Sequence, residues 1–237
     1  MKAEVEEAAA AGEKEKKSAP KQDSLGNKIW REVLSWFWVI VAFLLIEGTL
    51  VQARVIPSGS MERTVLIGDH LIVSRIGYDA GIPFTDYHVP LWRDPKRQQI
   101  IVFRAPLPGN PDFIKRVIGL PGDTIEIKHG VVYINGNPLS EPYREEEPNP
   151  SEFRATIHVP PGKYFMMGDN RENSYDSRYW GFVPRENIIG APLMIYMSID
   201  APEQVWEPGH VGERFATYIN AVIHPREVRW NRLFHTF

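Results

Sequence analysis

An apolar run from Val33 to Ala53, VLSWFWVIVAFLLIEGTLVQA, constrains the fold most strongly because it carries a single charged side chain. A helix of about 20 residues spans about 30 Å, which is the thickness of the hydrocarbon core of a bilayer. Trp30, Trp36 and Trp38 lie at its N-terminal side, where aromatic residues gather at a membrane interface. We therefore predict one transmembrane anchor helix over residues 29–53.

Two other interpretations of this run were weighed. A buried core helix is disfavoured by its length. A cleaved secretory signal is suggested by the small-residue sequence Val51-Gln52-Ala53, but the long preceding tail and the charge at Glu47 argue against it. Residues 1–28 are rich in Ala, Glu and Lys and predict a disordered tail. The lysines of this short tail predict that it stays inside the cell and that the following domain lies outside.

The sequence after residue 54 predicts a mainly β domain over 54–237, with an antiparallel sheet. Twenty prolines and 18 glycines separate short β-branched segments. We expect no long helix after residue 54, and we expect an excursion at about 128–163 in which the acidic stretch Glu141–Glu152 is exposed. The predicted strands are His70–Ile76, Gln99–Phe103, Phe113–Leu120, Thr124–Lys128, Val131–Ile134, Ala155–Val159, Lys163–Met167 and Ala191–Ile199.

Composition excludes several kinds of function. The net charge of −3 gives no basic excess for binding nucleic acid. The absence of cysteine excludes disulfides, cysteine-ligated zinc and thiol catalysis.

The segment VIPSGSMERT just after the anchor holds two serines that are candidates for chemistry. If the segment is extended, Ser58 and Ser60 project from the same face, and Gly59 lets a substrate backbone approach closely. Ser60 would then be a nucleophile, and its N–H and the Ser58 hydroxyl would bind the developing oxyanion. By spacing alone an ordinary turn remains the commoner reading of such a cluster.

A serine nucleophile needs a base, and none of the seven histidines lies in a recognisable triad pattern. Lys115 and Arg116 lie next to each other in a predicted apolar strand, and periodicity does not choose between them. The chemistry of the two side chains distinguishes them, because arginine stays protonated whereas lysine becomes neutral when apolar neighbours remove its water. A lysine of ordinary pKa, about 10.4, is neutral in only about one molecule in 2,500 at pH 7, so burial would have to lower its pKa. A strand lysine that extends to solvent is the alternative.

A charged, turn-rich stretch, GDNRENSYDSRYWGFVP, runs from Gly168 to Pro184. Such density of Asp, Asn, Arg and Ser suits a loop that braces an active site, although a solvated surface loop is the alternative.

Taken in order, these blocks resemble the type I signal peptidase (leader peptidase) family of serine/lysine-dyad peptidases. The resemblance runs from the membrane span to the C-terminus and is most specific in four segments, followed by a terminal RWNRLF. The four segments are PSGSM (Pro57–Met61), GDHLIVSR (Gly68–Arg75), FIKRVIGLPGD (Phe113–Asp123) and the Gly168–Pro184 stretch.

The resemblance implies a role for each matching residue. Ser60 falls on the nucleophile, Lys115 on the general base, Ser58 on the side-chain oxyanion donor and Ser174 on the hydroxyl that orients the lysine amine. The supporting charged positions are Asp169, Arg116, Arg171, Asp176 and Arg178. Substrate binding is expected of Ile56 and Met61, as walls of shallow pockets.

Two positions depart from the family pattern. Arg63 stands where the family commonly has proline, and Gln98-Gln99 stand where it commonly has Gly-Asp. Both positions lie outside the expected dyad, so they bear on local loop geometry rather than on the reaction.

The implied function is removal of signal peptides from secreted preproteins by cleavage after small residues, in the Ala-x-Ala manner, without metal or organic cofactor. The implied partners are signal-peptide-bearing preproteins, membrane lipid and the secretion translocon, at the cytoplasmic (inner) membrane of a bacterium. Two alternatives are a related Ser/Lys protease that cleaves itself or a dedicated substrate, and a membrane-tethered β-domain that serves as a non-catalytic envelope binding or assembly module.

Overall fold

The computed structural model describes residues 25–81, 85, 87–144 and 147–237. The chain divides into two units, the first ending at Phe43 and the second running from Leu44 to Phe237. The disordered tail expected over 1–28 lies outside the described residues as far as position 24, whereas residues 25–28 are helical.

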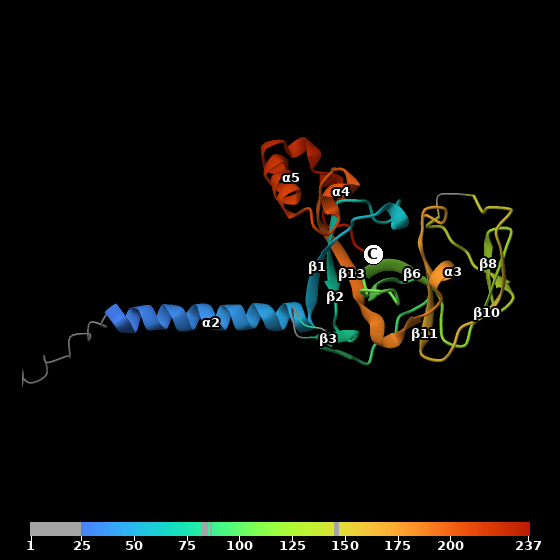
Figure 1. Cartoon of the computed structure of the whole chain (residues 1–237), viewed down its shortest axis with the longest axis horizontal. Coiled ribbons are helices and arrows are strands. Elements are labelled where there is room, and N and C mark those ends of the chain that lie inside the picture. The colour runs from blue at the N-terminus through green and yellow to red at the C-terminus, as the bar shows by residue number, and fades with distance from the viewer. Residues whose placement is uncertain (1–24, 82–84, 86, 145–146) are drawn as a thin grey trace, which may run out of the picture. The chain divides into compact units, whose positions relative to one another are not determined.

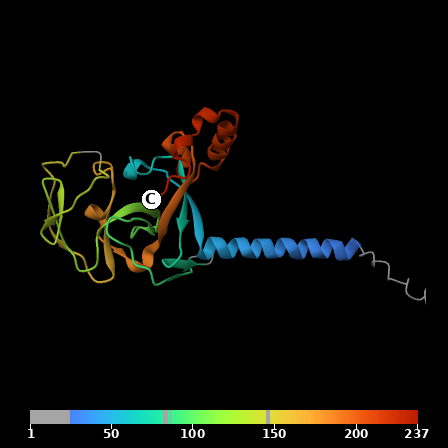
Figure 2. The same ribbon diagram turned by 180° about the vertical axis from the view of Figure 1, so that it is seen from behind.

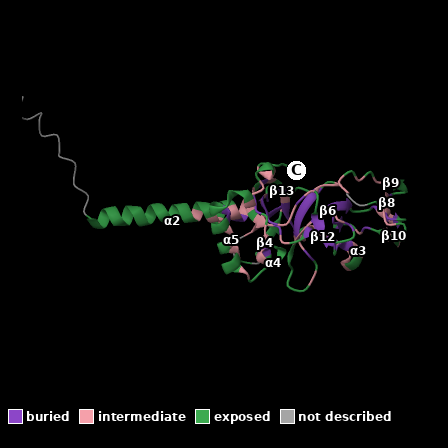
Figure 3. Cartoon of the chain, turned by 90° about the horizontal axis from the view of Figure 1, so that it is seen from above, coloured by how far each residue is buried: buried purple, intermediate pink, exposed green. Residues whose placement is uncertain are grey.

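The long apolar helix is α2, Leu25–Thr49, which is long and apolar enough to cross a membrane (Figure 1). Its 25 residues correspond to about 37 Å of helix, and its side chains are largely exposed (Figure 3). The predicted bounds of 29–53 are wrong at the C-terminal end, because residues 51–53 belong to a strand. Gly48 and β-branched Thr49 are poor helix formers, and Val51 is favoured in a strand.

The main sheet is antiparallel, with the strand order β1-β2-β13-β5-β6-β11-β12 in the described part of the chain (Figures 1 and 2). Every predicted strand corresponds to an observed one, and the predicted fold class is confirmed. The strands of this sheet are β1 Val51–Val55, β2 Asp69–Ser74, β5 Ile100–Arg104, β6 Asp112–Gly119, β11 Lys163–Met167, β12 Val183–Pro184 and β13 Ile188–Ser198.

A second, four-stranded sheet with the order β10-β7-β8-β9 is built from the expected excursion and the strand before it. In both ribbon views its strands lie beside β11 and α3 (Figures 1 and 2). Its strands are β7 Thr124–Lys128, β8 Val131–Ile134, β9 Asn137–Pro138 and β10 Phe153–His158, and a separate pair is formed by β3 Asp79–Gly81 and β4 His88–Pro90.

The expectation that Glu141–Glu152 is exposed is wrong for both of its ends. The side chains of Glu141 and Glu152 are only 6% and 15% exposed. Each carboxylate is paired with an arginine from elsewhere in the chain, which compensates the loss of water around the charge.

The expectation of no long helix after residue 54 is also wrong, because α5 spans Val211–Ile223. Phe215, Ile219 and Val222 recur at helical spacing, so the sequence carries the signal for this helix. The shorter helices are η1 Gly59–Met61, α3 Ser177–Trp180, η2 Arg185–Asn187, α4 Glu203–Trp206, η3 Pro225–Glu227 and η4 Trp230–Arg232.

Candidate active site

The two-serine segment bends instead of running straight. Ser58 is extended, with φ −138° and ψ 154°, but Gly59–Met61 forms the short helix η1. The premise that both serines lie in one extended segment is therefore wrong. Glu62 N–H donates to Gly59 O at 3.0 Å and closes the turn, which buries Ser60 (7% exposed) and leaves Ser58 exposed. Both serines still line one cavity.

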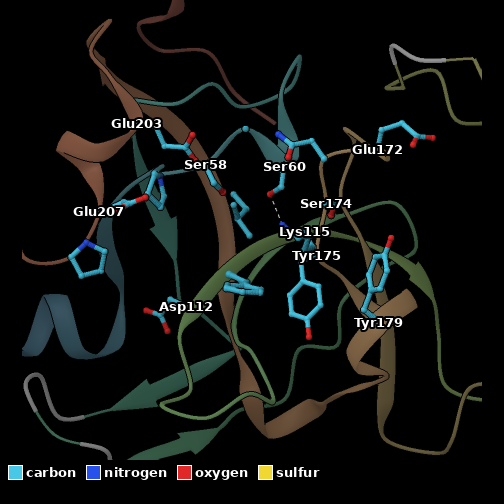
Figure 4. Close-up of a pocket in the computed structure, with 16 residues that line it drawn as sticks. Ser58, Ser60, Asp112, Lys115, Glu172, Ser174, Tyr175, Tyr179, Glu203 and Glu207 are labelled. Atoms are coloured by element: carbon cyan, nitrogen blue, oxygen red, sulfur yellow. Dashed lines mark hydrogen bonds between the residues drawn. The ribbon is translucent and has the colours of Figure 1, made fainter.

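Lys115 lies in the middle of β6, where it pairs with Ile101 of β5. Its Nζ donates a hydrogen bond to Ser60 Oγ (Figure 4). The residue is only 4% exposed, and the Phe113 ring lies 5.4 Å from Nζ. Burial lowers the pKa of Lys115 from 10.5 to about 8, partly opposed by the negative charges of Asp176 and Asp169.

The other cation of this strand has a different role. Arg116 donates from Nε and Nη2 to the two carboxylate oxygens of Asp169 at 2.8 and 2.6 Å, and both side chains are largely buried. Thr64 Oγ1 donates to the same carboxylate at 2.6 Å. This bidentate pair joins β6 to the start of the loop 168–178, which we call the bracing loop.

The bracing loop holds the backbone of the serine segment. Asn170 N–H donates to Ser60 O at 3.2 Å, and Asn170 Nδ2 donates to Gly59 O at 3.1 Å. These bonds fix the carbonyl groups on both sides of the Ser60 amide. They therefore determine the direction in which the Ser60 N–H and Oγ point.

Asp176 organises the other end of the bracing loop. Its carboxylate accepts from Ser174 Oγ at 2.7 Å, from Gly168 N–H at 3.0 Å and from Arg178 Nε at 2.9 Å, and it caps helix α3. Among the described residues no hydrogen bond joins Ser174 to Lys115. The Ser174 proton is directed at Asp176, so the Oγ lone pairs remain free to accept. Ser174 and Lys115 line the same cavity (Figure 4).

Gly168 is a site residue that the sequence analysis missed. An ideal Cβ at this position would lie 2.3 Å from Ser174 Oγ and 2.4 Å from Ser60 O. Only glycine therefore allows the bracing loop to approach the serine segment so closely. The only sequence signal was a glycine immediately before Asp169. No local pattern indicates which atoms pack against that glycine in the fold.

The cavity at Ser60 and Lys115 has a volume of about 660 Å³ (Figure 4). Ile56 and Met61, expected to form substrate-pocket walls, are 3% and 0% exposed and pack in the core with Val65 and Leu71. Asp169, Asp176, Arg116, Arg171 and Arg178 lie behind the cavity rather than in its lining. The lining consists of Pro57, Ser58, Gly59, Ser60, Asp112, Phe113, Ile114, Lys115, Glu172, Asn173, Ser174, Tyr175, Tyr179, Glu203, Glu207 and Pro208.

The two departures from the family pattern share an unusual backbone. Arg63 has φ 80° and Gln98 has φ 63°. Proline, whose φ is fixed near −65°, does not fit the conformation seen at Arg63, whereas the conformation at Gln98 is one that glycine adopts readily. Both side chains also bind backbone carbonyls in the expected excursion, those of Arg144 and Ser140.

Comparison with known proteins identifies the family. The model of the family "Signal peptidase, peptidase S26" matches residues 29–197. Signal peptidase I of Pseudomonas fluorescens is 36% identical over 206 residues, covering 71% of this chain and 72% of that protein. The probable signal peptidase I-2 of Synechocystis sp. is 38% identical over 196 residues, with 78% and 81% covered.

Signal peptidase I of Aquifex aeolicus is 32% identical, and the aligned part covers 84% of this chain and 96% of that protein. The family match takes in more than half of the chain and includes the serine segment, β6 and the bracing loop. The chain therefore belongs to the signal peptidase family, peptidase S26.

Proposed function

We propose that this signal peptidase cleaves preproteins with Ser60 as the nucleophile and neutral Lys115 as the general base. The observation that carries the proposal is the hydrogen bond between Lys115 Nζ and Ser60 Oγ, formed by an amine that is 4% exposed. With a pKa of about 8, about one lysine in ten is neutral at pH 7. The base is thus available near neutral pH without a histidine.

The reaction begins when the lone pair of Lys115 Nζ takes the proton of the Ser60 hydroxyl. Oγ then attacks the carbonyl carbon of the scissile peptide bond and forms a tetrahedral oxyanion. Lys115, now an ammonium, gives its proton to the departing amine, which leaves an ester on Ser60. Water, deprotonated by the same amine, hydrolyses the ester and regenerates the hydroxyl.

The oxyanion is bound by the Ser60 N–H and the Ser58 hydroxyl. Ser60 is the second residue of η1, and amides in the first turn of a helix have no acceptor within that helix. Ser58 is exposed at the cavity and can rotate its hydroxyl towards the oxyanion.

Ser174, Asp176 and Arg178 position the base. Ser174 Oγ donates its proton to the Asp176 carboxylate, so its lone pairs would accept a hydrogen bond from the neutral amine during the reaction and orient the lone pair of the amine. Arg178 fixes the carboxylate in turn. The Arg116–Asp169 pair and Arg171 hold the start of the bracing loop.

The substrates in this proposal are secreted preproteins cleaved after small residues. Ile56 and Met61 lie in the core next to the serine segment, so they would limit the depth of a shallow pocket from beneath. Such a pocket selects alanine by excluding larger side chains, since one methylene changes binding by only about 1–3 kcal/mol.

We place the enzyme in the inner membrane of a bacterium, held in the lipid by α2, with its N-terminus in the cytoplasm and the β domain on the outer, periplasmic face. Confinement of enzyme and preprotein to one membrane raises their effective concentration. A contact with the secretion translocon would serve the same purpose.

The test is in vitro processing of a preprotein by the full chain and three variants. Ser60→Ala and Lys115→Ala should abolish cleavage while the thermal unfolding transition remains. Lys115→Arg should also be inactive, because it retains the charge but not the basicity. Full activity in Ser60→Ala or Lys115→Ala would refute the dyad, and activity in Lys115→Arg would show that the lysine is structural.

A further inference from the structure

The shape of the bracing loop depends on two buried arginines within it. Arg171 Nε donates to Gly168 O at 3.0 Å, and Arg178 Nη2 donates to Arg171 O at 2.6 Å. The two guanidinium groups thus bind backbone carbonyls at Gly168 and Arg171. A shift of either guanidinium would move Gly168 or Ser174, both of which contact the dyad region.

Each of these guanidinium groups is held from its other side by a glutamate. Arg171 forms a bidentate pair with Glu141, in which Nη1 lies 3.1 Å from Oε2 and Nη2 donates to Oε1. Arg178 Nη1 donates to Glu152 Oε1 at 2.9 Å. The four side chains are 2–15% exposed, so these ion pairs are shielded from solvent and salt.

Both glutamates belong to one connection, residues 139–144 and 147–152, which we call the strap. It joins β9 to β10 and is itself fixed to the body of the domain. Gln98 Nε2 donates to Ser140 O at 2.6 Å, and Arg63 Nη1 donates to Arg144 O. At the far end, Gly130 N–H donates to Glu152 O at 3.1 Å. These bonds fix the backbone of the strap. The two carboxylates therefore keep their positions and hold the arginines in place.

Gln98 and Arg63 are the two positions at which this chain departs from the family pattern. Each departure thus supplies a side chain that ties down the strap. The strap is thus fixed by side chains at positions outside the family motifs, and the motifs alone do not indicate that it supports the active site.

We infer that Glu141 and Glu152 are positioning residues for the dyad, acting through Arg171 and Arg178 on the bracing loop. The inference rests on the proposed Ser60–Lys115 function. It makes the strap part of the catalytic apparatus, because the order Glu152–Arg178–Asp176–Ser174 is a continuous chain of hydrogen bonds that ends at a residue lining the same cavity as Lys115. Neither glutamate is among the described residues that line the cavity.

Neutralising one glutamate should disturb the reaction without disturbing substrate binding. Glu152→Gln leaves an acceptor for Arg178 but removes one of its two negative partners, so the guanidinium is free to shift towards Asp176. Glu141→Gln removes the negative charge of the bidentate pair that holds Arg171. Displacement of a catalytic group by about 1 Å can cost about a hundredfold in rate, and we expect a loss of about ten- to a hundredfold in kcat with KM within about twofold of the wild type.

The experiment measures kcat, KM and the pH profile of kcat/KM for the full chain in lipid vesicles, with a preprotein substrate. The variants are Glu141→Gln, Glu152→Gln and their double mutant. The matched control is Glu147→Gln, which removes the same charge from an exposed position of the strap. The charge of Arg178 lowers the pKa of Lys115, and Glu152→Gln removes a carboxylate that holds and compensates this guanidinium, so the rising limb of the profile should move to lower pH. A purely structural role would not move that limb.

Glu152→Asp serves as the rescue variant, since it keeps the charge and shortens the side chain by one methylene. It should recover the pH limb of the wild type and part of kcat. The double mutant should lose less than the product of the two single losses, because both glutamates act on one loop. If Glu152→Gln does not fold, kcat of folded Glu152→Asp tests the inference instead. A kcat equal to that of the wild type then overturns the inference.

The inference is also overturned if kcat of both single mutants stays within twofold of the control, or if KM alone changes. Its failure is distinct from failure of the dyad. If Ser60→Ala and Lys115→Ala are inactive while the glutamate variants are fully active, only the positioning role is lost. If Ser60→Ala is active, the proposed function itself fails.

Discussion

Lys115 Nζ donates a hydrogen bond to Ser60 Oγ, although the two residues are 55 positions apart and lie on a strand and a short helix. The contact is made inside the domain, because Lys115 is 4% and Ser60 is 7% exposed. Burial of the Lys115 amine lowers the stability of the fold, and the same burial lets the amine act as a base near neutral pH.

The buried lysine should lower stability at neutral pH. A pKa of about 8 instead of 10.5 corresponds to about 3 kcal/mol against the charged form. Between these two pH values the unfolded chain binds more protons than the folded one, so stability rises with pH. Lys115→Met should therefore be more stable than the wild type by up to about 3 kcal/mol at pH 7.

That advantage should shrink between pH 8 and pH 10.5. Urea unfolding of the full chain in detergent at several pH values measures it. A Lys115→Met variant that is less stable than the wild type at pH 7 would show that the lysine is charged and well paired in the folded state.

Gly168→Ala should inactivate the enzyme by a steric effect. The added methyl group would lie 2.3 Å from Ser174 Oγ and 2.4 Å from Ser60 O, so the bracing loop must move away. We expect a loss of at least about a hundredfold in kcat. Gly212→Ala in α5 is the control, because a Cβ there meets nothing within 4 Å and alanine favours a helix. Equal activity of the two variants would contradict the packing described for Gly168.

Ser174→Ala should reduce the rate while the dyad contact remains. The Asp176 carboxylate keeps its bonds from Gly168 and Arg178, so we expect a stability change of only about 1 kcal/mol. Loss of the hydroxyl that orients the neutral amine should lower kcat by about ten- to a hundredfold or more. Steady-state kinetics on a preprotein measure this, and unchanged kinetics would remove Ser174 from the mechanism.

Arg63→Pro should destabilise the domain even though proline is common at this position in the family. The backbone at Arg63 has φ 80°, which proline does not adopt, and the bond to Arg144 O is lost. We expect a cost of more than about 1 kcal/mol, whereas Arg63→Gly fits the backbone and loses only the hydrogen bond. The urea midpoints of the two variants provide the comparison. A proline variant as stable as the glycine variant would mean that the loop readily adopts the family conformation.

Much of this arrangement follows from local sequence patterns. The apolar run predicts α2, and β-branched segments predict the strands of both sheets. Their chemistry makes Ser60 and Lys115 candidates, and the resemblance to the family assigns their roles. The chemistry of lysine and arginine distinguishes Lys115 from Arg116. The structure assigns the two cations to different partners, Ser60 and Asp169.

The long-range pairs are what local patterns do not reveal. Glu141 and Glu152 stand in an acidic, proline-bearing stretch, and nothing in that stretch says which carboxylates are buried against Arg171 and Arg178. The need for Gly168 arises from a contact with Ser60 across the fold. The side chains of Arg63 and Gln98 bind carbonyls 81 and 42 positions away, which no local pattern indicates.

The most direct test of the central claim replaces the amine of Lys115 by a weaker base. Because the chain contains no cysteine, Lys115→Cys can be aminoethylated at that position alone to give a lysine analogue in which sulfur lowers the basicity of the amine.

The measurement is the pH profile of the single-turnover cleavage rate before and after this modification. Our account predicts that Lys115→Cys is inactive, that aminoethylation restores cleavage, and that the rising limb lies at lower pH than the wild-type limb near pH 8. Activity of unmodified Lys115→Cys, or rescue with the limb unmoved, would contradict the role of Lys115 as the general base.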